Sequence, residues 1–406
     1  MAKENIVVGL DVGTTKIAVC VGQIEEGLIK IIGGSCVPNS GMRKGMIVDI
    51  EDTISATSSA LEEAERMAGV ALTSAYVSIG GSHINSVTSK GVVAISRADG
   101  EITNSDVDRV IEAAKTVALP PNREIIHVIP KSFTIDNQTN IADPVGMTGI
   151  RLEAEAIVVG ASTAAIGNLQ KCVRQAGLSI DGFVFSPLAS SKILINKKQK
   201  EIGVAIVDIG GGTTSVAVFE EGDLAHCAVI PVGAGHITND IAIGLRTSLE
   251  LAEKIKLKYG SSIPEKISES EKINFNQIDP QDNQKVERKY LAEIIHARML
   301  EILSLVKDEL KKIGKDGMLP AGIIFTGGGA KTEDLIELAR EELRLPAEIG
   351  VSNLEIGGII DKIDNEVYST SVGLMLYGLE NPGKTRTLPT GNIVEKARGF
   401  FKQFLP

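Results

Sequence analysis

Two copies of one short pattern decide the fold: VVGLDVGTTKIAV at residues 7–19 and AIVDIGGGTTSVAV at residues 205–218. Each copy has a β-branched run, a turn that carries one Asp with Gly and two Thr, and a second β-branched run. Val and Ile favour strands and Gly allows a tight turn, so each copy predicts a β-hairpin. One such hairpin therefore lies in each half of the chain.

The residues of the two turns are suited to a polyphosphate. Gly brings backbone N–H groups close to an anion, and the Thr hydroxyls add donors. Carboxylates repel phosphate, so the two Asp are better suited to a hydrated divalent cation such as Mg²⁺. A lone Asp-x-Gly hairpin is usually only a turn, but two copies with one internal order weaken that alternative. The predicted binding residues are Asp11, Gly13, Thr14, Thr15, Lys16, Asp208, Gly210, Gly211, Gly212, Thr213 and Thr214, with Asp11 and Asp208 as the metal-binding and catalytic candidates.

A third Gly-rich element follows a predicted buried strand at residues 321–325. It contains Gly327, Gly328 and Gly329 and leads into a helix expected to start near Thr332. Glycines between a strand and a helix N-terminus allow close backbone approach to a flat ligand. Earlier in the chain, Glu253 and Lys256 share one helical face, where they are predicted to meet ribose hydroxyls; the alternative is a solvated ion pair.

Composition places the chain among ordinary globular proteins. Of 406 residues, 43% are apolar and 23% charged, which allows several domains. The formal charge of −10 argues against nucleic-acid binding. The four cysteines and five histidines have no metal-ligand spacing, so a reduced cytoplasmic setting is expected, without a zinc site. We expect neither a secretory signal nor a bilayer-spanning segment.

Hydrophobic periodicity predicts the remaining elements. The expected helices cover residues 49–69, 105–117 (capped by Ser105 or Asn104), 162–177 and 286–313, with one more beginning near Thr238 and running through Lys256. The expected strands cover 75–79, 87–95, 125–135 and 156–160. Because a new α+β pattern interrupts the first one, residues 82–154 are predicted to be an inserted domain.

The C-terminal segment has a different character. Residues 381–391 show no periodicity and predict a linker, whereas residues 392–405 place apolar side chains on one helical face with basic residues beside them. Such a helix is typical of a membrane interface; the alternative is a helix docked on its own domain. The predicted membrane contacts are Ile393, Val394, Lys396, Ala397, Arg398, Phe400, Phe401, Lys402, Phe404 and Leu405.

These elements, in this order, resemble the actin, DnaK-type chaperone and sugar kinase superfamily, an α/β two-domain fold with a nucleotide cleft. Residues 11–16 match its first phosphate motif, 208–214 its second and 327–330 its adenosine motif. Within the superfamily the chain looks specifically like the FtsA family of bacterial cell-division proteins over nearly its whole length. The distinctive stretches are SGMRKGMIVDI (40–50), VSIGGSHI (77–84), REIIHVIP (123–130) and DPVGM (143–147) followed by RLE (151–153).

The resemblance implies a division into subdomains. Subdomain 1A would comprise 1–81, 155–200 and 368–380; inserted subdomain 1C 82–154; subdomain 2A 201–233 and 316–367; and subdomain 2B 234–315. A linker at 381–391 and a membrane-targeting helix at 392–406 would follow. The family also implies ATP with Mg²⁺, actin-like protofilaments, recruitment of later division proteins, and a location at the division site on the cytoplasmic face of the membrane. The C-terminal peptide of FtsZ would dock on 2B, where Arg288, Lys289, Arg298 and Lys307 are candidates to meet its acidic residues.

One departure from the wider superfamily concerns hydrolysis. Chaperone-type members place a water-orienting carboxylate in a segment that corresponds to residues 185–189, and here Ser186 occupies that place. Since a serine is not a general base at neutral pH without help, we expect slow ATP hydrolysis at most. A sugar kinase would need a catalytic base and a chaperone a large further domain. A pilus-assembly protein of the PilM type is the nearer alternative, and the basic amphipathic C-terminus argues against it.

Overall fold

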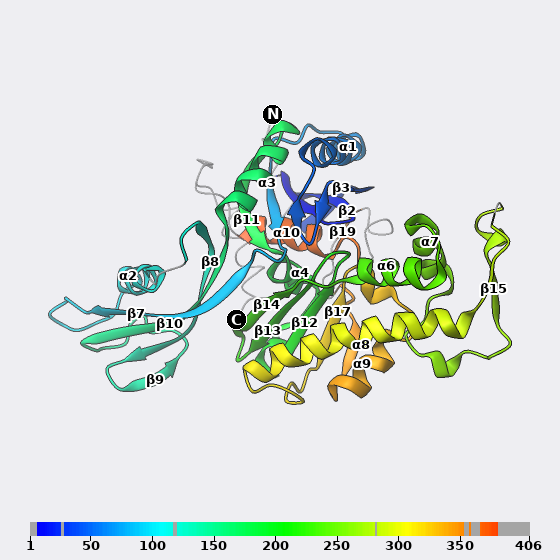
Figure 1. Cartoon of the computed structure of the whole chain (residues 1–406). Helices are drawn as coiled ribbons and strands as arrows, with labels where there is room; N and C mark the ends of the chain where they lie inside the picture. Colours follow the sequence, from blue (N-terminus) through cyan, green and yellow to red (C-terminus); the bar gives the residue numbers. More distant parts are fainter. Residues whose placement is uncertain are drawn as a thin grey trace.

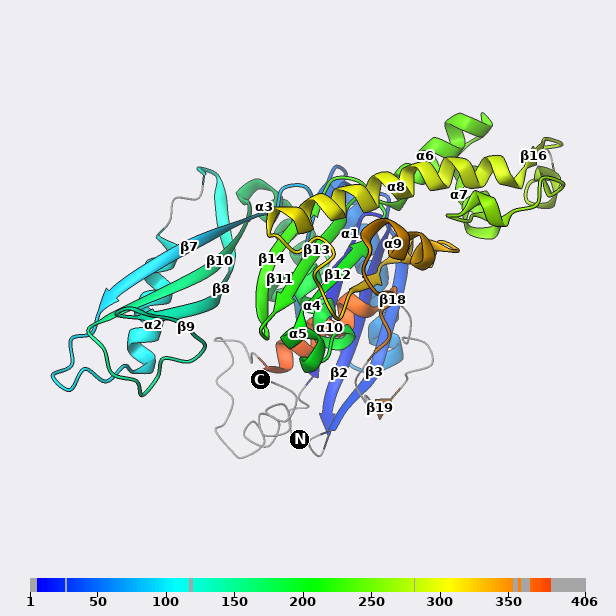
Figure 2. The ribbon, with the colours of Figure 1, turned by 90° about the horizontal axis from the view of Figure 1, so that it is seen from below.

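The computed structural model describes residues 6–25, 28–116, 120–280, 282–352, 357–358 and 366–380. The predicted linker and amphipathic helix lie outside these residues. Two α/β domains form the body, and a smaller inserted domain projects from one end while helices α6 to α8 extend from the other (Figures 1 and 2).

The first domain is built on a six-stranded sheet in the order β11-β6-β1-β2-β3-β19. Its strands are β1 (Ile6–Val12), β2 (Lys16–Glu25), β3 (Leu28–Pro38), β6 (Ser74–Ile79), β11 (Ser179–Phe185) and β19 (Gly357–Gly358). Strands β1 and β2 pair antiparallel with Asp11 opposite Ala18, which confirms the first predicted hairpin. Strand β19 pairs with β3, so the chain returns to this sheet at Gly357, whereas the predicted boundary falls after residue 367.

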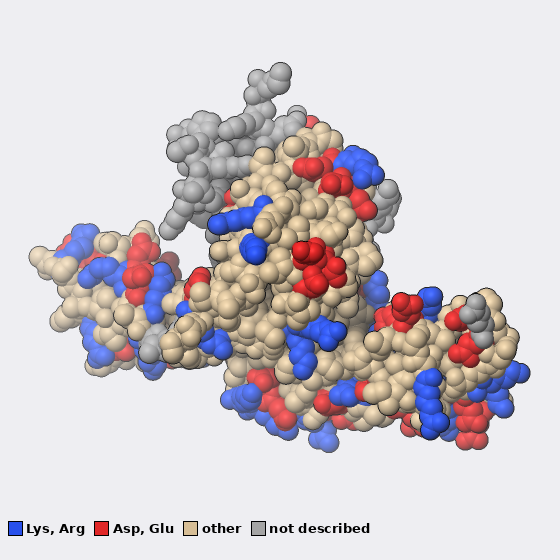
Figure 3. Space-filling model, turned by 45° about the horizontal axis from the view of Figure 1, so that its top comes forward, with Lys and Arg blue, Asp and Glu red and all other residues tan. Residues whose placement is uncertain are grey.

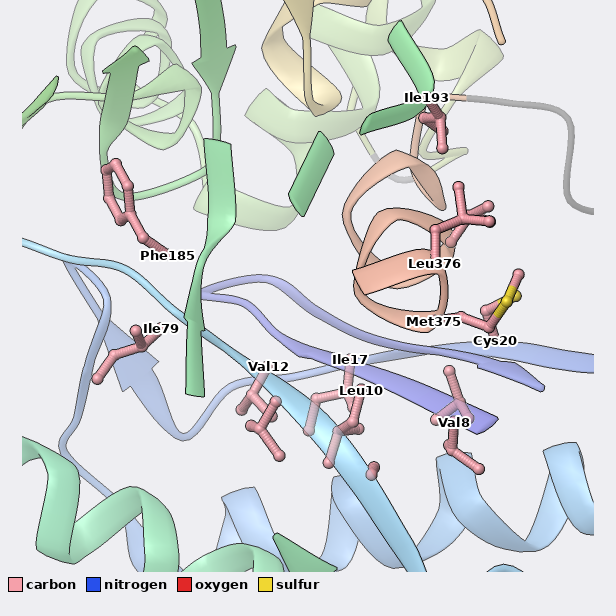
Figure 4. Close-up of a cluster of buried hydrophobic side chains, with 14 of the residues drawn as sticks. Val8, Leu10, Val12, Ile17, Cys20, Ile79, Phe185, Ile193, Met375 and Leu376 are labelled. Atoms are coloured by element: carbon pink, nitrogen blue, oxygen red, sulfur yellow. The ribbon is translucent and has the colours of Figure 1, made fainter. Parts of the chain in front are cut away.

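Helices cover both faces of this sheet. They are α1 (Ile50–Ala68), α3 (Thr163–Gln175), α4 (Ser186–Leu194) and α10 (Ser369–Glu380), and a hairpin of β4 (Met42–Arg43) and β5 (Met46–Ile47) precedes α1. The short helix α5 (Lys197–Ile202) follows α4 and contacts the second domain. Helix α1 lies on one side of the strands and α10 on the other (Figure 1). Met375 and Leu376 of α10 join the buried cluster around Leu10 and Cys20 (Figure 4). Helix α10 packs directly on β1, because a Cβ on Gly9 would lie 2.0 Å from the carbonyl oxygen of Ser371.

The inserted domain has its own four-stranded sheet, in the order β7-β10-β8-β9. Its elements are β7 (Asn85–Ala94), α2 (Asn104–Lys115), β8 (Arg123–Ile135), β9 (Gln138–Ile141) and β10 (Arg151–Ser162), packed around a separate small core. Thr103, not Ser105 or Asn104, caps α2, since its hydroxyl and backbone N–H both donate to the Asp106 carboxylate. The domain also reaches the second domain, where the Ser86 hydroxyl donates to the Cys227 carbonyl at 2.6 Å.

The second domain contains a five-stranded sheet in the order β14-β13-β12-β17-β18. Its strands are β12 (Val204–Ile209), β13 (Thr214–Glu220), β14 (Asp223–Ile230), β17 (Ile323–Thr326) and β18 (Ala347–Ile349). Strands β12 and β13 pair antiparallel with Asp208 opposite Ser215, so the second predicted hairpin also forms. In each domain the Asp-bearing strand is also paired in parallel, β1 with β6 and β12 with β17.

The helices of the second domain differ from the predicted ones at two points. They are α6 (Ala234–Leu245), α7 (Leu249–Tyr259), α8 (Arg288–Lys312) and α9 (Leu335–Leu343), with single 3₁₀ turns η1 (Pro264–Lys266), η2 (Phe275–Gln277) and η3 (Gly328–Lys331) and a small β15 (Lys272–Asn274) to β16 (Lys285–Glu287) ladder. The helix predicted from Thr238 through Lys256 is two helices, because Arg246 adopts a φ of 53°. The helix predicted near Thr332 begins at Leu335, because η3 follows the strand first.

Candidate functional site

A cavity of about 590 Å³ lies between the two main domains. Nearly all the residues predicted to bind a nucleotide line it: Asp11, Gly13, Thr14, Thr15, Lys16, Asp208, Gly210, Gly211, Thr213, Glu253, Lys256, Gly327, Gly328 and Gly329. They come from the β1–β2 turn, the β12–β13 turn, α7 and the segment after β17. The structure thus brings together four segments that are far apart in the sequence.

The two hairpin turns have the same hydrogen bonding and touch each other. Gly13 N–H donates to the Lys16 carbonyl and Gly210 N–H to the Thr213 carbonyl, each at 2.9 Å. A Cβ on Gly211 would lie 2.4 Å from Cγ2 of Thr15. Glycine is therefore required at position 211 by contact between the turns, and backbone N–H groups and Thr hydroxyls from both domains converge on one space.

Gly212 and Thr214 are not among the cavity-lining residues. Thr214 is buried, and its hydroxyl donates to the Val232 carbonyl at 2.8 Å, so it holds β13 to the segment before α6. A Cβ on Gly212 would lie 2.8 Å from the Lys44 backbone nitrogen. Thr214 therefore supports the turn within its own domain, whereas Gly212 packs against residues 14 and 44 of the first domain.

The two Asp carboxylates and one lysine carry the charge at the centre of the cavity. Lys16 Nζ lies 3.8 Å from the Asp11 carboxylate and also donates to the Val367 carbonyl. Burial, and then the Asp11 carboxylate, raise the pKa of Asp208 to about 6, while Lys16 opposes the shift. The site therefore holds more negative charge than its own lysine compensates, and a divalent cation fits this need.

The donor set favours a particular kind of cation. No group of three or more His, Cys, Asp or Glu side chains suited to a metal occurs in the part of the chain that the structure describes. A cation between Asp11 and Asp208 would thus take most ligands from water and from a bound phosphate, which is how Mg²⁺ is commonly held.

The glycine triplet after β17 packs mainly on its own domain. Gly327 has a φ of 84°, and a Cβ there would lie 2.2 Å from the Asp208 carboxylate; a Cβ on Gly329 would lie 2.3 Å from the Ile209 side chain. Gly328 has no atom within 4 Å of its ideal Cβ position. Two of the three glycines are therefore needed for packing on β12, and Gly328 leaves open space toward the cavity.

Glu253 and Lys256 form an ion pair and also line the cavity. Their side chains form an ion pair at 2.6 Å, as the solvated alternative predicts. Both also contact the Thr238 hydroxyl, which donates to Glu253 and accepts from Lys256 at 2.8 Å. Because Lys256 is nearly buried while Glu253 is half-exposed, the pair forms a polar wall of the cavity.

Several lining residues were missed by the sequence interpretation as binding residues. They are Gly45, Gly80, Gly81, Lys331, Glu366 and Thr370, among others. Gly45 and Gly81 touch each other, since a Cβ on Gly45 would lie 2.3 Å from the Gly81 Cα. Both lie in the distinctive stretches 40–50 and 77–84, which was the available signal. Ser186 also lines the cavity, and its hydroxyl donates to the Ile79 carbonyl at 3.3 Å.

The four basic residues predicted to meet an acidic peptide all have partners within the chain. Arg288 contacts Glu271, Glu333 and the Tyr259 carbonyl, and it lowers the pKa of Glu271. The remaining contacts are Lys289 with Glu269, Arg298 with Asp240 and Glu301, and Lys307 with the Glu342 carbonyl. Figure 3 likewise shows basic and acidic side chains interspersed over the face it presents. No helix among the described residues has the length and apolar character needed to cross a bilayer.

The sheet order, the two matching hairpins and the interdomain cavity define an actin-like fold. Solved structures support this class: the PilM–PilN type IV pilus biogenesis complex matches with a TM-score of 0.68 at 14% identity, covering 92% of this chain and 98% of that one. MreB5 of Spiroplasma citri bound to ADP matches with a TM-score of 0.50 at 14% identity, covering 98% and 96%. At these identities the likeness concerns the fold alone.

Sequence comparison gives the particular family. The model "Cell division protein FtsA" matches residues 205–373, and "SHS2 domain inserted in FTSA" matches 81–160. Cell division protein FtsA of Pseudomonas aeruginosa is 40% identical over 93% of this chain and 90% of its own length. The Bacillus subtilis protein is 39% identical over 94% and 85%, and the Escherichia coli K12 protein 36% over 93% and 91%. The chain therefore belongs to the FtsA family and has a role in cell division, and its insertion is the FtsA-type domain.

Proposed function

We propose that the cavity binds ATP with Mg²⁺. The observation that carries this proposal is the contact of two phosphate-type turns from different domains beside two carboxylates. The N–H groups and Thr hydroxyls of the turns would orient the phosphates, and Lys16 would offset their charge. Asp11 and Asp208 would hold the hydrated cation, which neutralises phosphate charge when bound. Glu253 and Lys256 would meet the ribose, and Gly328 would leave room for the base.

Hydrolysis of this ATP is expected to be slow. Ser186 occupies the place at which related ATPases carry a water-orienting carboxylate, and its hydroxyl already donates to a backbone carbonyl. Neutral serine does not take a proton from water. A turnover well above about one per minute in a purified, membrane-free assay would contradict this proposal, although that rate is still below the ordinary range for enzymes.

The C-terminal residues are proposed to attach the protein to the cytoplasmic face of the cell membrane. Six large apolar side chains between residues 393 and 405, each contributing ~1 to 1.5 kcal/mol when half-buried, give roughly 6 to 9 kcal/mol. Ordering the segment offsets much of this, so a single copy would bind reversibly. Because linked copies gain avidity without new contacts, polymerisation into actin-like protofilaments and membrane attachment would reinforce each other.

The proposed partners follow from the family. The protein would anchor FtsZ filaments by binding their C-terminal peptide on residues 234–315 and would recruit later division proteins at the division site. A PilM-like role in pilus assembly is not favoured, since the PilM match, at 14% identity, is one of fold alone, while the Pseudomonas aeruginosa FtsA relative is 40% identical.

Binding and assembly are tested separately. Calorimetry with ATP, with and without Mg²⁺, should show Mg²⁺-dependent binding by the full chain and by a chain that ends at residue 391. Only the full chain should pellet with anionic liposomes and form filaments on a lipid monolayer. Equal pelleting of the two chains would contradict the membrane assignment, and absence of ATP binding in both would contradict the nucleotide assignment.

A further inference from the structure

An ion pair spans the rim of the cavity and joins the two main domains. Lys331 Nζ lies 3.0 Å from the Glu366 carboxylate. Lys331 belongs to η3 in the second domain, whereas Glu366 lies three residues before the start of α10 in the first. Both residues line the cavity, and their side chains are 47% and 23% exposed, so the pair lies at the boundary between cavity and solvent.

Each end of this pair is fixed to a rigid element of its own domain. On the Lys331 side, η3 packs against β12 through Gly329, where a Cβ would lie 2.3 Å from the Ile209 side chain. On the Glu366 side, the next residue accepts a hydrogen bond from Lys16 through the Val367 carbonyl. The chain then enters α10, which is in direct contact with β1. Separation of the domains at this rim would therefore break the Lys331–Glu366 contact.

We propose that Lys331 and Glu366 form a clasp across the cleft that slows the release of a bound nucleoside polyphosphate. The inference rests on the proposed function. A ligand that contacts the turns at residues 13–16 and 210–213 would lie inside the cavity, and the charged pair bridges its rim. Both side chains would act as positioning residues, by holding the domains together and not by chemistry on the ligand.

The clasp differs in a measurable way from a direct contact between Lys331 and the ligand. If Lys331 acted on the ligand alone, its replacement would have the same effect whether or not Glu366 were present. If the two act as a pair, the effects of single replacements do not add, which a double-mutant cycle measures. A pair that is partly open to solvent is also weakened by salt.

The test uses the full chain loaded with a fluorescent ATP analogue and Mg²⁺, chased with excess unlabelled ATP in a stopped-flow instrument. Lys331→Gln and Glu366→Gln should each speed release roughly two- to fivefold, the range expected for a partly exposed ion pair. The double variant should release no faster than the single ones. Exchanging the charges, with Lys331→Glu and Glu366→Lys together, should return release toward the wild-type rate. Raising ionic strength from about 0.05 to about 0.5 M should speed the wild type more than the single variants.

Lys315→Gln is a matched control, since it breaks an ion pair with Glu220 inside the second domain, and neither residue lines the cavity. Its release rate should equal that of the wild type. Additive effects of the two Gln substitutions on the release rate would overturn the clasp while ATP binding itself stands. So would a charge-exchanged variant that releases the analogue as fast as, or faster than, the single variants. Failure of the wild type to bind the analogue would overturn the proposed function and the clasp together. If Lys331→Gln does not fold, Glu366→Gln and its salt dependence still decide the matter.

Discussion

Replacing Asp208 by Asn should stabilise the ligand-free protein while weakening its binding of Mg²⁺ with ATP. Burial, followed by the Asp11 carboxylate, raises the pKa of Asp208 from 3.8 to about 6. An unfolded chain ionises this group at its ordinary value, so folding opposes ionisation whenever the pH is above about 4. At ~1.36 kcal/mol per pKa unit, a shift of about 2 units corresponds to ~3 kcal/mol at pH 7. This is an upper bound, because Asp208 keeps some contact with solvent.

The pH dependence has a definite sign. Because the folded protein holds the Asp208 proton more tightly, stability due to this residue is greatest below pH 4, falls as the pH rises to about 6, and is constant above that. The gain from Asp208→Asn should therefore be about half of its full value at pH 5 and complete above pH 7. His127 makes the wild type less stable as the pH falls, which is the opposite pH dependence. Burial lowers the pKa of His127 to about 4, so its contribution to stability is lost as the pH drops from 6.5. Comparing variant with wild type at each pH removes the His127 contribution.

Urea unfolding at pH 5 and pH 7.5, without nucleotide and with a chelator present, measures the gain, and calorimetry measures ATP binding with Mg²⁺. Asp308→Asn is the control, since Asp308 is an exposed residue of α8 paired only with Lys311 in the contacts described. We expect it to change stability by less than ~0.5 kcal/mol. A neutral or destabilising effect of Asp208→Asn at pH 7.5, or a gain that does not shrink at pH 5, would refute the argument from burial.

Two further substitutions test the packing around the cavity and the inserted domain. Gly327→Ala should lower the free energy of unfolding by ~1 to 3 kcal/mol, because its φ is 84° and the new Cβ would meet Asp208. Gly328→Ala, which meets no neighbour, should leave urea unfolding nearly unchanged, and equal effects of the two would contradict this account. His127→Ala removes the acceptor of the Phe185 N–H and should cost ~1 to 3 kcal/mol. It should also abolish the loss of stability between pH 6.5 and 4 that His127 causes, and an unchanged pH profile would exclude His127 as its source.

Much of the fold could be predicted because its signals are local. The hairpins at residues 7–19 and 205–218 each contain their own strands, turn and register, so β-branched runs and glycines were sufficient. The predicted range of α1, 49–69, agrees with its caps in the structure: the Asp49 side chain accepts from the Asp52 N–H, and Gly69 ends the helix in the left-handed conformation. Such capping contacts involve residues a few positions apart, which a sequence displays directly.

Two helix boundaries were predicted wrongly because the residues that form them are not marked clearly in the sequence. The break between α6 and α7 is made by Arg246 at a positive φ, where glycine or asparagine would have been the expected marker. The cap of α2 was misplaced because Asn104 and Ser105 are good caps too, and the choice of Thr103 follows from its reciprocal bond with Asp106. In both cases the tertiary structure selects among locally similar options.

The residues of the candidate site also fall into two groups, those with a local sequence signal and those without one. Residues in the Gly- and Thr-rich turns were predicted, since their types and spacing indicate phosphate binding. The Lys331–Glu366 pair joins two domains and has no spacing rule to show it. Gly45 and Gly81 could not be predicted as site residues, although both lie in distinctive stretches. They are needed because they pack on each other, and a sequence does not show a contact between distant segments.

The four basic residues of α8 are not equivalent in what their replacement would show. Arg298 donates twice to Asp240 on α6, and Arg288 holds both Glu333 and the Tyr259 carbonyl, so each stabilises the domain itself. Truncating either would disturb the fold as well as any surface that a peptide could use. Lys289, in contrast, pairs with Glu269, whose side chain is 87% exposed. Because such a pair is worth ~1 kcal/mol or less, an acidic peptide could displace Glu269 with little cost. Loss of peptide binding in a Lys289 variant would therefore be direct evidence for the predicted contact, whereas the same loss in an Arg288 or Arg298 variant would first have to be separated from damage to the domain.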